Sequence, residues 1–233
     1  IDTVDLAKEY GTPLYVMDEQ VVRKNLRRFH ESMQKYYSGR GEVHYASKAF
    51  SCLEMCRIVA SEGDGLDAVS IGELYTAVKA GFPMDKVGFH GNNKTNDELE
   101  YALDCGVGHI IVDNISELHR LEKIAAEKGV KANIMFRIKP GIDAHTHDFV
   151  KTGQIDSKFG FALETGEAFE AVKEAIACEN VSLEGLHCHI GSQIFDIDPF
   201  VEAAKVMLGL IAKIKQYIRF SIKLLCNIRN STI

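Results

Sequence analysis

An alternation of strand and helix patterns runs along most of the chain and limits the folds that it can adopt. Short β-branched or apolar runs recur at residues 43–47, 66–69, 87–90, 109–113, 132–138 and 183–190. A helical pattern follows each run, and strands that alternate with helices indicate parallel βαβ units. The first four runs start about 22 residues apart, a spacing more typical of a (β/α) barrel than of an open sheet.

Capping signals support the predicted helices. Ser51, Ser70 and Thr95 each precede a glutamate by three residues. In such a capping box the hydroxyl and the carboxylate satisfy free amides of the first helical turn. Asp18 precedes an amphipathic pattern and is expected to cap a further helix before the first strand.

We therefore expect an α/β fold, a TIM-type (β/α)8 barrel that is truncated. Six strands are clear in the sequence, whereas a closed barrel of this type needs about eight. A long connection rich in Gly and His, residues 140–162, interrupts the rhythm, and long loops in compact domains are usually functional. The predicted organisation is an N-terminal segment (residues 1–20), an incomplete barrel (21–215) and an atypical tail (216–233).

The charge distribution argues against two classes of partner and marks the tail. The chain has 27 Lys and Arg against 33 Asp and Glu, a net charge of −6. Residues 203–233 contain six basic residues and no acidic one, so the first 202 residues carry a net charge of −12. An acidic chain has no overall attraction to nucleic acid, and no run of about 18 apolar residues could span a bilayer. We expect neither a nucleic-acid nor a membrane partner.

Cysteine usage and the N-terminal sequence indicate the compartment. The six cysteines form no CxxC pair, and no basic segment followed by an apolar one opens the chain. We expect a cytoplasmic protein with reduced thiols.

Polar side chains gather where the predicted strands end. Lys48 ends the first strand, Asp67 lies in the second and Arg137 ends the fifth. His187 and His189 lie in the sixth strand, and they share a face because side chains alternate along a strand. Further polar residues close the third and fourth strands, namely His90, Asn92, Lys94 and Asp113. In a (β/α) barrel this end of the strands carries the active site.

Lys48 is the strongest candidate for a nucleophile. It follows a short strand that we expect to be buried on both faces. Burial of a lysine lowers its pKa and leaves a neutral amine that can attack a carbonyl group. The alternative is an ordinary solvated lysine at a strand end.

The other candidates also have two readings. Ser192, between Gly191 and Gln193, could bind phosphate through amides and a hydroxyl, or the three residues could be a plain turn. Asp67 and Arg137 could act in the site or form a structural ion pair with each other.

A zinc site is a further possibility at the sixth strand. It would combine His187, Cys188 and His189 with His145 and His147. Because Cys188 points to the opposite side of the strand, the tetrahedral geometry would be poor, and we expect no metal. The residues alone therefore suit Schiff-base chemistry on a phosphorylated carbonyl compound.

An ordered series of motifs resembles the fold-type III pyridoxal-phosphate decarboxylases, whose barrel is of the alanine racemase type. The resemblance covers about residues 5–215, and its earlier motifs are residues 45–49, 65–70, 89–94 and 111–113. The later motifs are more similar to the diaminopimelate branch of the family than to the ornithine branch. They are residues 137–141, 144–147, 152–154, 156–160 and 187–193.

The resemblance implies a role for each candidate residue. Lys48 would attach pyridoxal 5'-phosphate covalently and is the catalytic residue. His189 would stack on the cofactor ring, and Ser192 would hydrogen-bond its phosphate. Asp67 and Arg137 would lie in the inner shell beneath the cofactor.

The resemblance also implies a reaction. It is the decarboxylation of the small-molecule amino acid meso-2,6-diaminopimelate to L-lysine and CO2, a step of lysine biosynthesis, in a homodimeric enzyme. The family continues into a glycine-rich phosphate loop, a Glu-Pro-Gly-Arg segment and a C-terminal β domain, none of which this sequence contains. From about residue 216 the family pattern stops, at the charge break. We therefore expect a truncated or frameshifted product whose activity alone is open; the alternative is a divergent natural tail in which residues 220–228 form a seventh strand.

Three other functional readings stay open. One is a single-barrel pyridoxal-phosphate-binding homeostasis protein without decarboxylase activity. Another is an unstable fragment, because an open barrel leaves unpaired strand edges that favour aggregation. The third is a decarboxylase for a D-amino acid or a carrier-bound substrate.

Overall fold

The computed structural model describes residues 2–142, 158–192 and 194–230 of the chain. These residues form two compact units that divide between residues 43 and 44. The predicted boundaries at residues 20/21 and 215/216 stay predictions.

The first unit contains two capped helices, α1 (Thr3–Tyr10) and α2 (Glu19–Tyr37). Asp18 caps α2 as expected, because its Oδ1 accepts hydrogen bonds from the backbone N–H groups of Gln20 and Val21.

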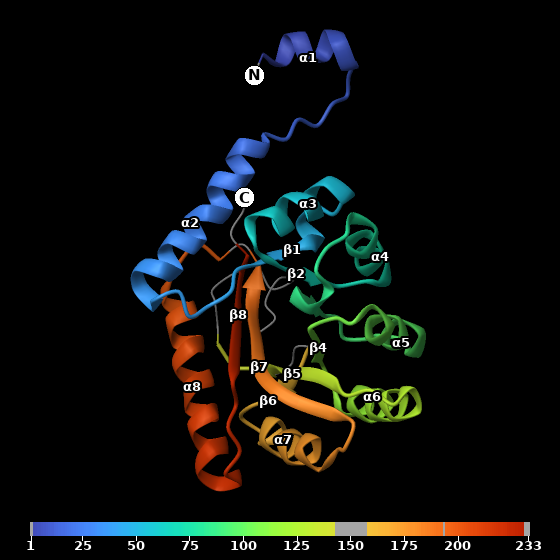
Figure 1. The fold of residues 1–233 in the computed structure, drawn as a ribbon. Coiled ribbons are helices and arrows are strands. Elements are labelled where there is room, and N and C mark those ends of the chain that lie inside the picture. Colours follow the sequence, from blue (N-terminus) through green and yellow to red (C-terminus); the bar gives the residue numbers. More distant parts are fainter. Residues whose placement is uncertain (1, 143–157, 193, 231–233) are drawn as a thin grey trace. The chain divides into compact units, whose positions relative to one another are not determined.

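The second unit is built on a curled parallel sheet (Figure 1). Its strands follow the order β1-β2-β3-β4-β5-β7-β8, and every neighbouring pair is parallel. The six predicted strands are confirmed as β1 (His44–Ala46), β2 (Gly65–Ala68), β3 (Val87–Phe89), β4 (His109–Val112), β5 (Ala132–Lys139) and β7 (Val181–Ser192). Together they form an incomplete barrel, as the sequence predicts.

Helices cover the outside of this sheet (Figure 1). They are α3 (Leu53–Glu62), α4 (Ile71–Ala80), α5 (Asn96–Cys105), α6 (Ile115–Lys128), α7 (Glu167–Ala177) and α8 (Asp198–Ile218). Two short 3-10 helices adjoin strands: η1 (Ser47–Ala49) follows β1, and η2 (Met84–Lys86) precedes β3. Apolar side chains fill the layer between helices and strands: Phe89 and Ile134 in the strands and Leu99 and Leu118 in the helices are all fully buried. Among the described helices, none combines the length and the apolar character that a membrane-spanning helix needs.

Two strands were not among the six clear ones. β6 (Phe161–Ala162) pairs with β5 at the end of the long connection. β8 (Leu224–Asn230) lies in the tail and pairs in parallel with β7. The seventh strand of the alternative reading is therefore present, but it starts at Leu224 rather than at residue 220, because residues 219–223 come between α8 and the sheet.

One predicted helix cap is wrong. α3 begins after Cys52, whose Sγ accepts the N–H of Met55, and not after Ser51. The capping box at Thr95 is complete. Ser70 caps α4 through its hydroxyl, but the carboxylate of Glu73 turns away from the Ser70 amide to accept from Ser47 and from the N–H of Val69.

All six cysteines are free thiols, and Cys188 is the most informative of them. Its side chain is fully buried on the outer side of β7, and burial raises the pKa of the thiol to about 12. We expect iodoacetamide at pH 8 to leave Cys188 unmodified in the native protein, because neither the thiolate nor access is available. Peptide mass spectrometry would follow the labelling, with the partly exposed Cys105 as internal control. Equal labelling rates of Cys188 and Cys105 in folded protein would contradict this prediction.

Candidate active site

The parallel sheet places the five predicted site residues at one end of the strands. Lys48 follows β1, Asp67 lies in β2, Arg137 lies near the end of β5, and His189 and Ser192 lie at the end of β7. The strand register sets Ala46 beside Asp67 and Arg137 beside His187. Carboxyl ends of parallel strands lie at the same edge of a sheet, so the five residues lie at one end of it.

Lys48 differs from the prediction in its exposure. The strand ends at Ala46, and the 3-10 helix η1 carries Lys48 beyond the strand end, where it is exposed. The expectation of a strand buried on both faces is therefore wrong. The pKa of the Lys48 amine is nevertheless lowered, first by partial burial of the amine and then by the charge of Arg137.

Asp67 is a buried carboxylate held by two histidines. Its Oδ1 lies 3.1 Å from His44 Nδ1 and 3.3 Å from His90 Nε2. Burial raises the pKa of Asp67, but the two histidines outweigh burial and hold the pKa well below its usual range. The alternative ion pair between Asp67 and Arg137 does not occur, because each binds other partners.

Replacement of Asp67 by asparagine tests this account. At pH 7 we expect Asp67→Asn to lower the free energy of unfolding by roughly 1.5–3 kcal/mol, the scale of a hydrogen bond to a charged group. The folded pKa is depressed, so the stabilisation is complete above the unfolded carboxyl pKa of about 3.9 and is lost as the pH falls toward the folded pKa. Urea unfolding of both proteins between pH 7 and pH 3 measures the difference. A difference that grows toward pH 3 would refute the assignment.

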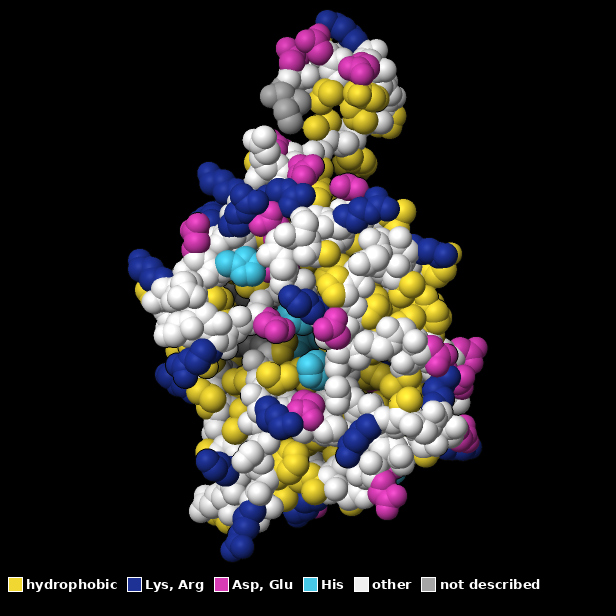
Figure 2. Space-filling model, in the orientation of Figure 1, with side chains coloured by type: hydrophobic (Ala, Val, Ile, Leu, Met, Phe, Trp, Pro, Cys, Tyr) yellow, Lys and Arg dark blue, Asp and Glu magenta, His cyan; other side chains and the backbone are white. Residues whose placement is uncertain are grey.

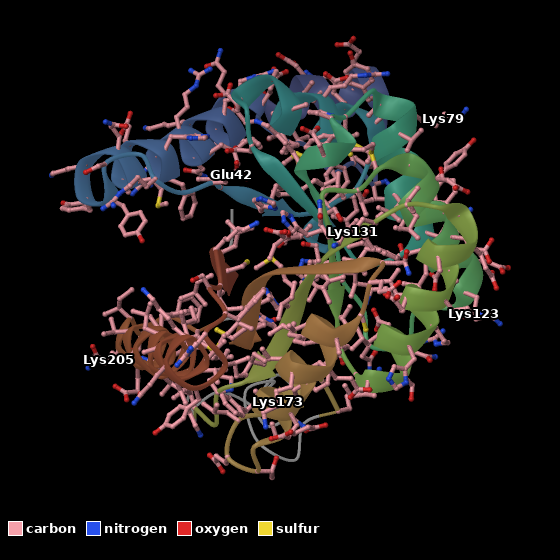
Figure 3. The ribbon with its side chains drawn as sticks, turned by 60° about the horizontal axis from the view of Figure 1, so that its bottom comes forward. Glu42, Lys79, Lys123, Lys131, Lys173 and Lys205 are labelled. Carbon is pink, nitrogen blue, oxygen red and sulfur yellow. The ribbon has the colours of Figure 1, made fainter. Side chains whose placement is uncertain are left out.

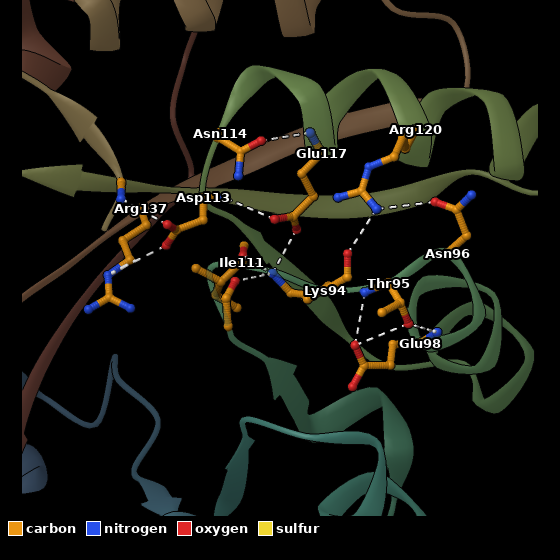
Figure 4. A network of polar contacts seen from close by, with 12 residues as sticks. Lys94, Thr95, Asn96, Glu98, Ile111, Asp113, Asn114, Glu117, Arg120 and Arg137 are labelled. Atoms are coloured by element: carbon orange, nitrogen blue, oxygen red, sulfur yellow. Dashed lines mark hydrogen bonds and ion pairs between the residues drawn. The ribbon is translucent and has the colours of Figure 1, made fainter. Parts of the chain in front are cut away.

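Arg137 is held between a carboxylate and an aromatic ring. Its Nε lies 3.8 Å from Asp113 Oδ1, and its Cζ lies 4.2 Å from the centroid of the Phe159 ring. The other oxygen of Asp113 accepts a hydrogen bond of 3.0 Å from the N–H of Gly160 (Figure 4). Arg137 is 8% exposed, so its guanidinium is a nearly buried cation with a fixed position.

His187 contributes a polar group with unmet hydrogen-bonding capacity. Its ring packs edge-on against His90, with centroids 4.9 Å apart, and is completely buried. Neither ring nitrogen has a hydrogen-bond partner within the described part of the chain. Burial holds the pKa of His187 well below its ordinary value, so the ring is neutral. Buried polar atoms without partners need an explanation, and a bound ligand or water is one.

The surface view shows where charged and histidine side chains gather. Histidine side chains are visible in a recess near the middle of one face, beside acidic and basic side chains (Figure 2). Other lysines, among them Lys79, Lys123 and Lys173, lie on the outer helices, away from the strand ends (Figure 3). The pKa of Lys48, by contrast, is affected by the charges of both Arg137 and Asp67.

Two residues of the site were not predicted from the sequence. His44, in the first strand, binds Asp67. Glu117, in α6, binds Lys94 and the backbone of Asp113. The signal for Glu117 was present, because Asn114 precedes it by three residues and caps α6.

Several predicted motif residues lie outside the described residues. They are His145 and His147 of the zinc alternative, the remainder of 144–147, residues 152–154, 156 and 157, and Gln193. Within the described ranges no group of three or more His, Cys, Asp or Glu side chains could hold a metal ion.

Comparison with known families and proteins gives consistent matches. The family described as "Pyridoxal-dependent decarboxylase, pyridoxal binding domain" matches residues 20–226. Diaminopimelate decarboxylase of Bacillus methanolicus is 48% identical over 225 residues, which are 97% of this chain and 52% of the relative. The Bacillus subtilis enzyme of the same name is 48% identical over 207 residues, 88% of this chain and 46% of the relative. The chain thus spans about half the length of these relatives.

Solved structures give the same picture. Diaminopimelate decarboxylase from M. jannaschii, in complex with L-lysine, has a TM-score of 0.89 and 35% identity, covering 100% of this chain and 56% of that one. The Helicobacter pylori enzyme with L-lysine has a TM-score of 0.86 and 33% identity, covering 96% of this chain and 55% of that one. A lysine/ornithine decarboxylase from Vibrio vulnificus, at 21% identity and a TM-score of 0.79, shares the fold.

Proposed function

The chain belongs to the pyridoxal-dependent decarboxylases, whose pyridoxal-binding domain it contains, and from this premise we propose that its protein decarboxylates meso-2,6-diaminopimelate to L-lysine. The observation that carries the proposal is Lys48, an amine of lowered pKa beside Arg137 and Asp67 at the carboxyl end of a parallel barrel. A non-enzymatic homeostasis protein is not favoured, because relatives up to 48% identical are named as decarboxylases.

The residues present fit pyridoxal phosphate. The cofactor needs an amine for its aldehyde, and Lys48 has one whose lowered pKa increases the neutral, nucleophilic fraction at pH 7. It carries a phosphate, and Arg137 and the Ser192 hydroxyl are groups that suit an anion. The two unpartnered ring nitrogens of His187 lie in the same part of the barrel and offer hydrogen bonds to a ligand or to water around it.

Each residue then has a task in the reaction. The cofactor, when bound, supplies the electron sink for the electron pair that CO2 leaves behind. Lys48 holds the cofactor between turnovers. His44 and His90 keep Asp67 ionised, so Asp67 supplies a negative charge of fixed position. Arg137, held by Asp113, supplies a cation of fixed position for an anionic group. His189 would stack on the cofactor ring and shield one face of it from water, and Ser192 would bind the phosphate.

The substrate and the assembly belong to the proposal as well. The two structural relatives above at 33% and 35% identity hold L-lysine, which is the product that the proposed reaction releases. A small amino-acid substrate and a homodimer are what the family resemblance implies. The groups that recognise the distal end of diaminopimelate are expected outside this chain. The chain spans about half the length of the relatives.

Covalent trapping tests the proposal directly. The purified chain is incubated with pyridoxal 5'-phosphate, reduced with borohydride and digested for peptide mapping. We expect a visible absorption band before reduction and one dominant modified peptide containing Lys48. Modification scattered over exposed lysines such as Lys79 and Lys123, with no band, would refute the assignment of Lys48.

A further inference from the structure

A buried ion pair lies behind the candidate active site. Lys94 Nζ is 2.6 Å from Glu117 Oε1, and the two side chains are 2% and 0% exposed (Figure 4). The Lys94 ammonium also donates to the carbonyl oxygens of Gly91 at 2.7 Å and Ile111 at 2.8 Å. All three of its protons are therefore used, each by a different element of the fold.

These contacts connect the ends of the strands β3 and β4. Gly91 directly follows His90, which binds Asp67. Ile111 lies in β4, two residues before Asp113, and Glu117 lies in the first turn of α6. One ammonium group thereby ties the ends of β3 and β4 to the helix that follows β4.

Glu117 carries the connection to Arg137. Its Oε2 accepts a hydrogen bond of 3.4 Å from the N–H of Asp113. Asp113 in turn contacts Arg137 and accepts the N–H of Gly160. A continuous series of contacts thus leads from Lys94 through Glu117 and Asp113 to Arg137, a cation of the site.

We propose that Lys94 and Glu117 are a positioning pair, which sets Asp113 and through it the place of Arg137 at the strand ends. The role of Arg137 toward an anionic group rests on the proposed function. The positioning itself does not, because it concerns contacts within the chain.

Physical chemistry favours positioning over a purely stabilising role. Moving two charges out of water is costly, and apolar residues of similar volume often replace a buried ion pair with no loss of stability. A pair whose every donor and acceptor is fixed by a separate element instead defines one geometry. A displacement of about 1 Å at a reacting site is enough to cost a large factor in rate.

A pair of double variants separates the two roles. Lys94→Met/Glu117→Leu removes both charges and the acceptor of the Asp113 N–H. Lys94→Met/Glu117→Gln also removes both charges but keeps an oxygen that can accept that N–H. The matched control is Lys128→Met/Asp104→Leu, which removes an ion pair of 2.7 Å between α6 and α5, with side chains 26% and 61% exposed.

The first readout needs no cofactor. Hydrogen exchange of the Gly160 amide reports the position of Asp113, because that amide donates to Asp113 Oδ2. We expect exchange about tenfold faster in the leucine variant, the scale of one weakened charge-assisted hydrogen bond. We expect a smaller acceleration in the glutamine variant, which keeps the acceptor but loses the Lys94 ammonium that holds it, and wild-type exchange in the control. Unchanged exchange in the leucine variant, or equal acceleration in both Lys94 variants, would overturn the proposal. A leucine variant that does not fold while the glutamine variant folds would also overturn it, because the acceptor at position 117 would then be required for the fold itself.

The second readout uses pyridoxal 5'-phosphate as the probe. We expect its dissociation constant to rise about tenfold in the leucine variant and to stay unchanged in the control. If the wild-type chain takes the cofactor at Lys48 and the leucine variant binds it equally well, the link to Arg137 fails while the proposed function stands. If the wild-type chain takes no cofactor, the proposed function fails and the exchange result alone decides the positioning role.

Discussion

Lys48→Ala is expected to abolish covalent capture of pyridoxal phosphate, from stoichiometric labelling to background. The amine that attacks the aldehyde is then missing, and no other group of the site described above is a primary amine poised to replace it. Lys48 is exposed, so the free energy of unfolding should change by no more than about 0.5 kcal/mol. Borohydride trapping and urea unfolding measure the two quantities.

Two further variants make the result specific. Lys48→Arg keeps a positive charge beside Asp67 but has no nucleophilic amine at neutral pH, so it should trap no more cofactor than Lys48→Ala. Lys123→Arg changes a lysine of α6 whose side chain is 77% exposed, and it should trap as much cofactor as the wild type. A reducible adduct of normal yield in Lys48→Ala would show that another lysine is the attachment point.

The fold was predictable where its signals are local. Each of the strands β1 to β4 is a short apolar run followed by a helix with a side-chain cap, and both features are visible in nearby residues. The family followed from motifs in a fixed order. The strands β6 and β8 were harder to predict from the sequence, because β6 has only two residues and β8 lies in a tail of unusual composition. Their existence depends on pairing with β5 and β7, which is a non-local interaction.

The site was predictable as a location and less so as a set of contacts. Parallel strands bring Lys48, Asp67 and Arg137 to the same edge, which topology alone implies. The partners of each side chain depend on distances across the barrel, which the sequence does not give. In the structure Asp67 binds His44 and His90, and Arg137 binds Asp113. Lys48 is exposed rather than buried because its strand ends two residues early, and strand ends are the least predictable feature of a sequence.

Breaking the buried pair from one side should have the largest effect on stability. Glu117→Leu leaves the Lys94 ammonium without its carboxylate in a completely buried position. We expect the free energy of unfolding to fall by roughly 3–5 kcal/mol at pH 7, the usual cost of leaving a buried charge uncompensated. The double variant Lys94→Met/Glu117→Leu should recover most of this loss, and urea unfolding of the two variants and the wild type measures it.

The pH dependence of Glu117→Leu identifies the uncompensated group. Burial lowers the pKa of Lys94, and Glu117 is the main group that raises it again. Without Glu117 the folded pKa falls further below the unfolded value of about 10.4, so the unfolded chain binds more protons between the two values and stability rises with pH there. The deficit of Glu117→Leu relative to the double variant should therefore shrink between pH 7 and pH 10. A deficit that is constant over this range would mean that lost packing, rather than a buried charge, causes the destabilisation.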